Sequence, residues 1–164
     1  MAMDSLARLR RPPHASRGFT LVELVVVVSL MGIGAVMAMP SLAEAMRGQR
    51  LRAATTDLTS ALLMARSEAI KRGSQVRVTP RAGNDWATGW TVVAVTAGDQ
   101  IDRKDMLGTD VTVTRAPVSI VYERSGRLAT PGVLRVQLAA GAQTPRCVTI
   151  DPGGLPRQTM GTCP

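Results

Sequence analysis

The stretch from Phe19 to Met39 constrains the fold more than any other part of this sequence, because its 21 residues carry a single charge, that of Glu23. A helix of this length would extend about 31 Å, which matches the hydrocarbon core of a bilayer. A carboxylate at membrane depth costs about 3 kcal/mol on insertion scales, and such residues usually have a partner and a function. The stretch therefore predicts a membrane-spanning helix in which Glu23 is functional. The alternative is a carboxylate that lies near the membrane surface.

The residues around this charge form a recognisable motif. Arg17-Gly18-Phe19-Thr20-Leu21-Val22-Glu23 is followed by the apolar run and then by Pro40. This arrangement resembles the class III signal of type IV prepilins and type II secretion pseudopilins. The resemblance implies that prepilin peptidase cleaves between Gly18 and Phe19 and that the new Phe19 amine becomes N-methylated. It also implies an assembly role for Glu23 and identifies Pro40 with the proline that kinks the helix in that family.

In that family, the carboxylate at this position is thought to meet the amino terminus of a neighbouring subunit. A cation and an anion buried together remove each other's desolvation penalty, whereas either one alone is expensive. The resemblance therefore implies that other pilin or pseudopilin subunits are partners through the N-terminal helix, and that this pairing sets the register between subunits.

An ordinary secretory signal, cut after Ala38, is the competing interpretation of residues 1–38. Two features oppose it, because the apolar run exceeds the usual 7–15 residues of such a signal and contains Glu23. A mature chain that starts at Met39 would be a secreted or membrane-tethered periplasmic domain with no filament role.

The distribution of charge predicts the topology. The formal net charge is +8, and residues 1–18 contribute +3 of it, from four arginines and one aspartate, which leaves about +5 on the mature chain. Positive residues before a membrane span stay in the cytoplasm. We therefore expect a single-pass inner-membrane protein whose C-terminal part is periplasmic. The remaining positive charge is a modest bias, for which a solvated basic surface is the simplest explanation.

The helical pattern continues beyond Pro40. Apolar residues recur at intervals of three and four, and Gly73 follows Lys71 and Arg72 as a stop signal. This predicts one helix from Phe19 to Arg72, apolar all round at first and amphipathic later. The alternative is a separate core helix after a break at Gly48. The apolar positions are Leu42, Ala45, Met46, Leu51, Ala54, Leu58, Leu62, Ala65 and Ala69, and we expect Met46, Leu62 and Met64 in the core.

The pattern switches to a period of two after Gly73, with turn residues between short apolar runs. Tight turns favour antiparallel pairing. The predicted fold class is α+β and pilin-like, with a long N-terminal helix, transmembrane in its first half, packed on antiparallel β-sheet. The expected segments are a leader at 1–18, a transmembrane segment at 19–40, an amphipathic continuation at 41–73 and a β-rich domain at 74–164. Within that domain we expect strands at 75–79, 89–96, 111–114, 118–122, 133–138 and 147–150, a turn at 81–88 and a charged loop at 100–110.

Two segments of the β-rich part resemble one branch of the same family. Residues 85–90, DWATGW, precede a valine-rich strand, and residues 122–128 read YERSGRL. Both are similar to the globular domain of GspH and FimT proteins. The resemblance implies a minor pilin or pseudopilin that assembles into a type II secretion pseudopilus or a type IV pilus. We expect Trp86 and Trp90 to be core or turn anchors.

The sequence predicts no enzyme, cofactor or metal site. The only histidine is His14, in the leader, so the mature chain cannot form a Cys–His or Ser–His–Asp set. It also has no Walker loop or dinucleotide fingerprint. Four aspartates crowd the segment 99–110, but their spacing is not that of an EF-hand and Arg103-Lys104 would repel a cation. We therefore expect a solvated charged loop there rather than a calcium site.

The C-terminal tail contains both cysteines. Cys147 and Cys163 can form a disulfide in an oxidising periplasm, the alternative being free thiols. FimT proteins of naturally transformable bacteria bind DNA through a tail that carries a Gly-Arg-x-Arg motif, which resembles Gly154-Leu155-Pro156-Arg157 here, with leucine at the first arginine position. The resemblance implies a second function, DNA binding by Arg146 and Arg157. The alternative is a stapled terminus whose charge is incidental.

Overall fold

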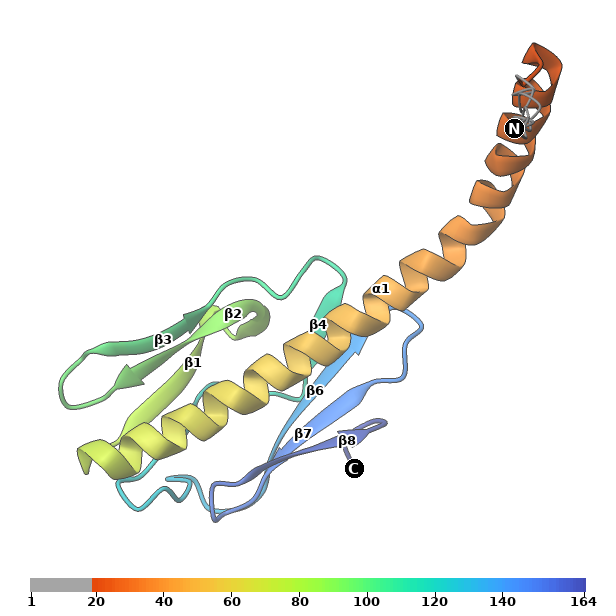
Figure 1. Ribbon diagram of the computed structural model, residues 1–164. Helices are drawn as coiled ribbons and strands as arrows, with labels where there is room; N and C mark the ends of the chain where they lie inside the picture. The colour runs from red at the N-terminus through yellow and green to blue at the C-terminus, as the bar shows by residue number, and fades with distance from the viewer. Residues whose placement is uncertain (1–18) are drawn as a thin grey trace, which may run out of the picture. The chain divides into compact units, whose positions relative to one another are not determined.

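The computed structural model describes residues 19–164 (Figure 1). The predicted leader and the Gly18 side of its cleavage site lie outside the described residues. The chain divides after Pro40 into two compact units, Met1–Pro40 and Ser41–Pro164, and each is described here by itself.

The helix α1 (Leu21–Arg72) has capping residues at both ends. At its start, the Thr20 hydroxyl accepts a hydrogen bond from the Glu23 backbone N–H at 3.2 Å, as an N-cap residue does. At its end, the backbone N–H groups of Gly73 and Ser74 donate to the carbonyls of Ile70 and Ala69. Together with the left-handed φ of 58° at Gly73, this is a Schellman motif, so the predicted stop signal is confirmed.

The first half of α1 is uncovered. Every described side chain from Phe19 to Arg47 is exposed, including the long run of leucines and valines. No single helix of the described part is long and apolar enough to cross a membrane alone, but the bent pair Leu21–Val36 and Ala38–Arg72 meets that test together, by length and composition. The break lies between Val36 and Ala38, and the ring of a proline at position 40 would meet the carbonyl of Val36, four residues before it. The kink at Pro40 remains a prediction.

The second half of α1 buries one stripe of small and branched side chains. The stripe recurs every three or four residues, as one face of an amphipathic helix must, and α1 passes through Gly48 without a break. Two predicted core methionines were wrong, because Met46 is 49 % exposed and Met64 is 39 % exposed. Both lie just outside the face that meets the sheets. The buried residues are Leu51, Ala54, Thr55, Leu58, Ala61, Leu62, Ala65 and Ala69.

The stripe packs on two four-stranded antiparallel sheets, over which the yellow part of α1 runs in Figure 1. The first sheet has the order β3-β2-β1-β5 and consists of β1 (Val76–Ala82), β2 (Asp85–Ala94), β3 (Gln100–Lys104) and β5 (Ile120–Tyr122). An ion pair ties this sheet to the helix, because Lys104 Nζ lies 2.6 Å from the carboxylate of Asp57.

The second sheet has the order β4-β6-β7-β8. It consists of β4 (Val111–Thr114), β6 (Leu134–Ala140), β7 (Arg146–Ile150) and β8 (Pro156–Met160). Gln158 of the edge strand β8 donates to the Thr59 hydroxyl of α1 at 2.8 Å. Both sheets therefore contact α1 through polar tethers as well as through the core, and the predicted α+β architecture is confirmed.

The two tryptophans of the DWATGW segment are core residues, as predicted. Trp86 and Trp90 are each 1 % exposed, and the Trp86 indole donates to the Pro117 carbonyl at 2.8 Å. Gly89 between them has a φ of 94°, and a side chain there would collide with the backbone of Lys104 and Asp105. The segment therefore has a structural explanation: two buried anchors and a glycine that admits the neighbouring strand β3.

Three predictions about the strands were wrong. The charged segment 100–110 was expected to be a loop, but it begins with β3, whose charged side chains suit an edge strand. The turn at 81–88 is shorter than expected, since β1 continues through Pro80 and only Gly83-Asn84 separate β1 from β2. A register shift after Pro80 accommodates that residue. Strand β8 was missed because it starts with a proline and lies in a Gly/Pro-rich tail.

Replacing Leu62 with alanine should lower the free energy of unfolding by roughly 2–5 kcal/mol, because Leu62 is fully buried between α1 and the sheets. Leu63→Ala is the matched control. Leu63 is 45 % exposed, so its replacement should change the free energy of unfolding by less than about 1 kcal/mol. Urea unfolding of the detergent-solubilised chain, followed by the fluorescence of the two buried tryptophans, measures both. Equal losses for the two variants would contradict the described helix orientation.

Candidate functional sites

The N-terminal site consists of Phe19, Thr20 and Glu23. Glu23 is the third residue of α1, on its first turn, and its side chain is exposed among exposed apolar neighbours. Phe19 is 80 % exposed. Within residues 19–164, Glu23 takes part in no ion pair. The carboxylate therefore has no charged partner among these described residues.

A local role for Glu23 exists beside an intermolecular one. Thr20 and Glu23 have the spacing of a capping box, in which the acidic side chain reaches back to the N-cap backbone. A negative charge in the first turn also interacts favourably with the helix dipole. Both effects together stabilise a helix start by about 1 kcal/mol, less than the penalty of placing a carboxylate in a membrane. Capping alone therefore does not explain a charge at this position.

The tail site lies on the outer face of the second sheet, the face turned away from α1. Cys147 and Cys163 form a disulfide with a Cα–Cα distance of 5.1 Å, which confirms the predicted pairing. Two hydrogen bonds fix the same turn of chain. Cys163 donates its N–H to the Gln137 side chain at 3.0 Å, and Arg115 donates to the Cys163 carbonyl at 2.8 Å. Arg115 is the non-glycine residue with positive φ, 50°, in the described part.

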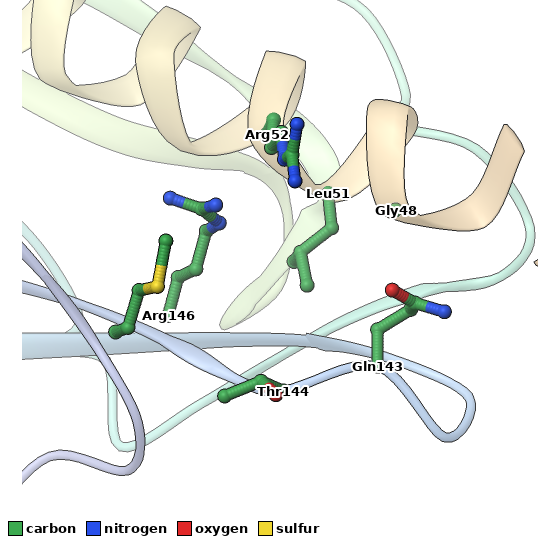
Figure 2. Close-up of a pocket in the computed structure, with 7 residues that line it drawn as sticks. Gly48, Leu51, Arg52, Gln143, Thr144 and Arg146 are labelled. Atoms are coloured by element: carbon green, nitrogen blue, oxygen red, sulfur yellow. The ribbon is translucent and has the colours of Figure 1, made fainter. Parts of the chain in front are cut away.

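The two arginines predicted to bind DNA point to opposite faces of the second sheet. In the β7–β8 register, Arg146 pairs with Met160, and Arg157 pairs with Thr149 three residues along β7. Two residues that are an odd number of positions apart in a strand point to opposite faces of the sheet. Arg146 is on the α1 side, as Figure 2 shows, and Arg157 is exposed on the outer side. They do not form one anion-binding pair.

The register brings Arg157 together with a residue that the sequence analysis did not select. Arg135 of β6 pairs with Thr149, which in turn pairs with Arg157, so the two arginines flank one threonine in a row across the outer face. Because β6 and β8 lie on either side of β7, the backbones at Arg135 and Arg157 are separated by about 10 Å, two strand spacings. The four strands of this sheet contain no Asp or Glu. The alternation in LRVQLAA could have placed Arg135 opposite the core residues.

Three of the four aspartates in the segment 99–110 have arginine partners. Asp99 lies 3.5 Å from Arg72, and Asp110 lies 3.3 Å from Arg50. Asp105 lies 2.6 Å from Arg81. Among the described residues, no three His, Cys, Asp or Glu side chains are placed to hold a metal ion. The acidic side chains here act as ion-pair partners.

The YERSGRL segment forms a packed junction beneath α1. Arg66 of α1 donates to the Gly126 carbonyl at 3.0 Å, and a side chain at Gly154 would collide with the same carbonyl. Tyr122 is buried, and its hydroxyl has no hydrogen-bond partner among the described residues. Burial raises the pKa of Tyr122 well above its usual value. Gly154 is needed because its backbone approaches that of Gly126, and Gly126 because a side chain there would collide with the Ile70 side chain of α1.

Comparison with known proteins identifies two matching families. The family model described as Type II transport protein GspH matches residues 54–154, which is more than half of the chain. The model described as Prokaryotic N-terminal methylation motif matches residues 13–39. No curated protein sequence matches the chain.

Two solved structures have a similar fold. They are crystal forms of the type IV minor pilin FimU of Pseudomonas aeruginosa strain PAO1, both with 20% sequence identity to this chain. The form in space group P21 has a TM-score of 0.59 and covers 70% of this chain and 90% of the FimU chain. The form in space group P65 has a TM-score of 0.55, with 68% and 92% covered. At this level of identity the likeness concerns the fold.

Reducing the disulfide should lower the free energy of unfolding by roughly 3 kcal/mol, because the bond closes a loop with a sequence separation of 16 residues. Urea unfolding of the intact chain with and without a reductant measures the effect. The double variant Cys147→Ser and Cys163→Ser is the control, since a reductant should not affect it. An unchanged midpoint for the natural chain on reduction would show that the tail is held by other contacts.

Proposed function

The chain belongs to the GspH family of type II transport proteins, and from this premise we propose how its residues serve a pilin-like filament. It is a minor pilin or pseudopilin, processed at its N-terminus and assembled into a filament of the pilus type. It is a structural subunit of a fold and family that are not enzymatic. Its N-terminal helix anchors a soluble C-terminal domain.

We propose that prepilin peptidase cleaves between Gly18 and Phe19 and that the Phe19 amine is then methylated. The match of the methylation motif to residues 13–39 supports this. The position of the helix start supports it as well, because Thr20 caps α1. Cleavage there would leave the new amine one residue before the N-cap, beside the first turn that carries Glu23.

We further propose that the exposed apolar half of α1 spans the inner membrane before assembly, with the domain in the periplasm. The exposure of its leucines and valines supports this, since water does not favour such a surface. The disulfide fits an oxidising compartment. In the filament, the same surface would pack against the helices of other subunits.

The observation that carries the assembly proposal is the exposed carboxylate of Glu23 on the first turn of an otherwise apolar helix. We propose that the Phe19 amine of a neighbouring subunit neutralises it. In a low-dielectric bundle, a paired carboxylate and amine avoid the penalty that each would have alone. The pair also fixes the stagger, because Phe19 of one subunit then lies level with Glu23 of the other.

Glu23→Gln should reduce the amount of the chain in sheared surface fibres by at least about tenfold, because a buried charge pair loses one partner. Glutamine keeps the hydrogen-bonding capacity that a capping box needs, so this variant separates charge from helix capping. Ser29→Ala, in the same apolar segment, is the control and should assemble normally. Mass spectrometry should find methylated Phe19 in all three proteins. Undiminished incorporation of Glu23→Gln, or a mature chain that starts at Met39, would contradict the proposal.

DNA binding is a second proposal. We propose that it involves the outer face of the second sheet and not the predicted pair Arg146 and Arg157. The observation that favours it is the row of Arg135 and Arg157 on a sheet whose strands contain no acidic residue. Arg157 is exposed and Arg135 is partly exposed, so phosphates can approach the row from solvent. Arginines that contact phosphates give sequence-independent, salt-dependent binding.

In a gel-shift assay with the intact detergent-solubilised chain at low salt, Arg157→Ala and Arg135→Ala should each weaken DNA binding by about three- to tenfold. Arg146→Ala is the matched control, because that side chain lies on the α1 side of the same sheet. No shift with the unmutated chain, or the same loss for Arg146→Ala as for Arg157→Ala, would overturn this second proposal.

A further inference from the structure

A basic hollow lies between α1 and the turn that joins β6 to β7, entirely within the unit Ser41–Pro164. It consists of two adjoining cavities of about 130 and 300 Å³, and both are lined by Gly48, Arg52 and Gln143. Arg146 also lines the smaller cavity, and Figure 2 shows its side chain rising from β7 toward α1. Among the described residues, this lining contains two positive charges and no acidic side chain.

The two arginines of the hollow lack the counter-ion that a neighbouring arginine has. Arg50 lies 3.3 Å from the carboxylate of Asp110, whereas neither Arg52 nor Arg146 takes part in an ion pair within residues 19–164. A guanidinium group stays charged in proteins and can donate two parallel hydrogen bonds to one carboxylate. Two such groups that line one cavity repel each other, and an anion between them would replace this repulsion with attraction. The hollow is therefore suited to an oxyanion group.

The remaining lining gives the hollow its shape. A Cβ at Gly48 would lie 2.9 Å from the side-chain oxygen of Gln143, so glycine at this position lets Gln143 lie against the helix. Leu51, which is buried, and Met160 contribute apolar surface beside the arginines. Apolar surface lowers the local dielectric constant, which strengthens an ion pair that forms next to it.

The hollow adjoins bare helix surface within the same unit. Every side chain from Ser41 to Arg47 is exposed, including the apolar side chains of Leu42, at 62 %, and Met46, at 49 %. An α-helix turns about 100° per residue, so Leu42 and Met46 both lie within about 60° of Gln49 around the helix axis. Gln49 lines the larger cavity. A protein that covers this apolar surface would therefore also reach the hollow.

We propose that the hollow binds a carboxylate side chain of a different kind of subunit in the same filament. This rests on the proposed function, because assembly is what brings another subunit onto the bare helix surface. The anionic side chains of proteins are carboxylates, so the group that a covering subunit delivers to the two arginines is an aspartate or a glutamate. Because the chain is a minor pilin or pseudopilin, its neighbours are chiefly subunits of other kinds.

Photo-cross-linking in filament-forming cells tests the proposal. The full chain carries the photoreactive amino acid p-benzoylphenylalanine in place of Gln49, and irradiated sheared fibres are analysed by mass spectrometry. We expect a cross-link to a subunit of another kind, at a segment that contains an aspartate or a glutamate. Adding Arg52→Glu should lower the cross-linked fraction of the chain present in the fibres at least about threefold, as expected for an ion pair at an accessible site. Arg52→Lys, which keeps the charge, should lower it by less than about twofold.

Two further variants make the test specific. Arg77→Glu is the matched control, because Arg77 is exposed on the face of β1 opposite the buried Val76 and Val78, and the change in net charge is the same. It should leave the cross-linked fraction unchanged. Replacing the captured acidic residue of the other subunit with arginine should restore most of the cross-linking that Arg52→Glu removes. Equal losses for Arg77→Glu and Arg52→Glu would overturn the proposal. A loss that no such reversal restores would assign the hollow to another anion, such as phosphate, and would overturn it too.

Failure of this inference and failure of the proposed function are distinguishable. If the chain with methylated Phe19 enters sheared fibres, but the cross-link is absent or ignores Arg52→Glu, the carboxylate inference is wrong and the filament role stands. If the natural chain is absent from the fibres, the assembly proposal fails and this inference fails with it.

Discussion

The burial of one face of α1 against two separate sheets is the interaction on which the domain depends. The two sheets have no strand in common, and the inner face of each is covered by the same stripe of helical side chains from Leu51 to Ala69. Small residues alternate with leucines along this stripe, which lets the helix approach both sheets closely. Polar tethers from Asp57 and Thr59 then fix the helix to one sheet each.

The uncovered half of the same helix has the opposite character. From Phe19 to Arg47 every described side chain is exposed, so among residues 19–164 this half has no packing partner comparable to that of the packed half. Membership of the GspH family explains the difference, since subunits of this kind assemble. Other subunits are the partner of the bare half in the filament, and we propose that the membrane covers it before assembly. A charge on such a surface is meaningful because apolar surroundings make an unpaired carboxylate expensive.

Much of this fold could be predicted from the sequence because its strongest signals are local. The helical pattern, the stop at Gly73 and most of the period-two strands each depend on neighbouring residues, and these elements were predicted correctly. The errors arose where tertiary contacts override local pattern. Strand β3 is polar because it is an edge, and β8 forms in a Gly/Pro-rich segment because β7 and the disulfide hold it. Met64 satisfied the helical spacing but lies beside the packed face.

The candidate sites also differ in whether local sequence was enough to predict them. The pairing of Cys147 with Cys163 needed only two cysteines and a compartment. The faces of Arg146 and Arg157 needed a strand that the sequence did not reveal, and without β8 the two side chains could be imagined on one loop. The close approach of Gln143 to Gly48 depends on a contact between a helix and a distant turn. In the sequence, Gly48 indicated only an alternative break in a helix that was predicted to be continuous.

The continuity of α1 through Gly48 has a mechanical consequence. A tensile load applied to α1 at Ser41 would pass through covalent backbone and helical hydrogen bonds directly into the packed stripe. The load would act along the helix, so the contacts from Leu51 to Ala69 would resist sliding together instead of peeling one after another. Forced unfolding is governed by the rate of barrier crossing rather than by equilibrium stability. The contacts between α1 and the two sheets would therefore share such a load.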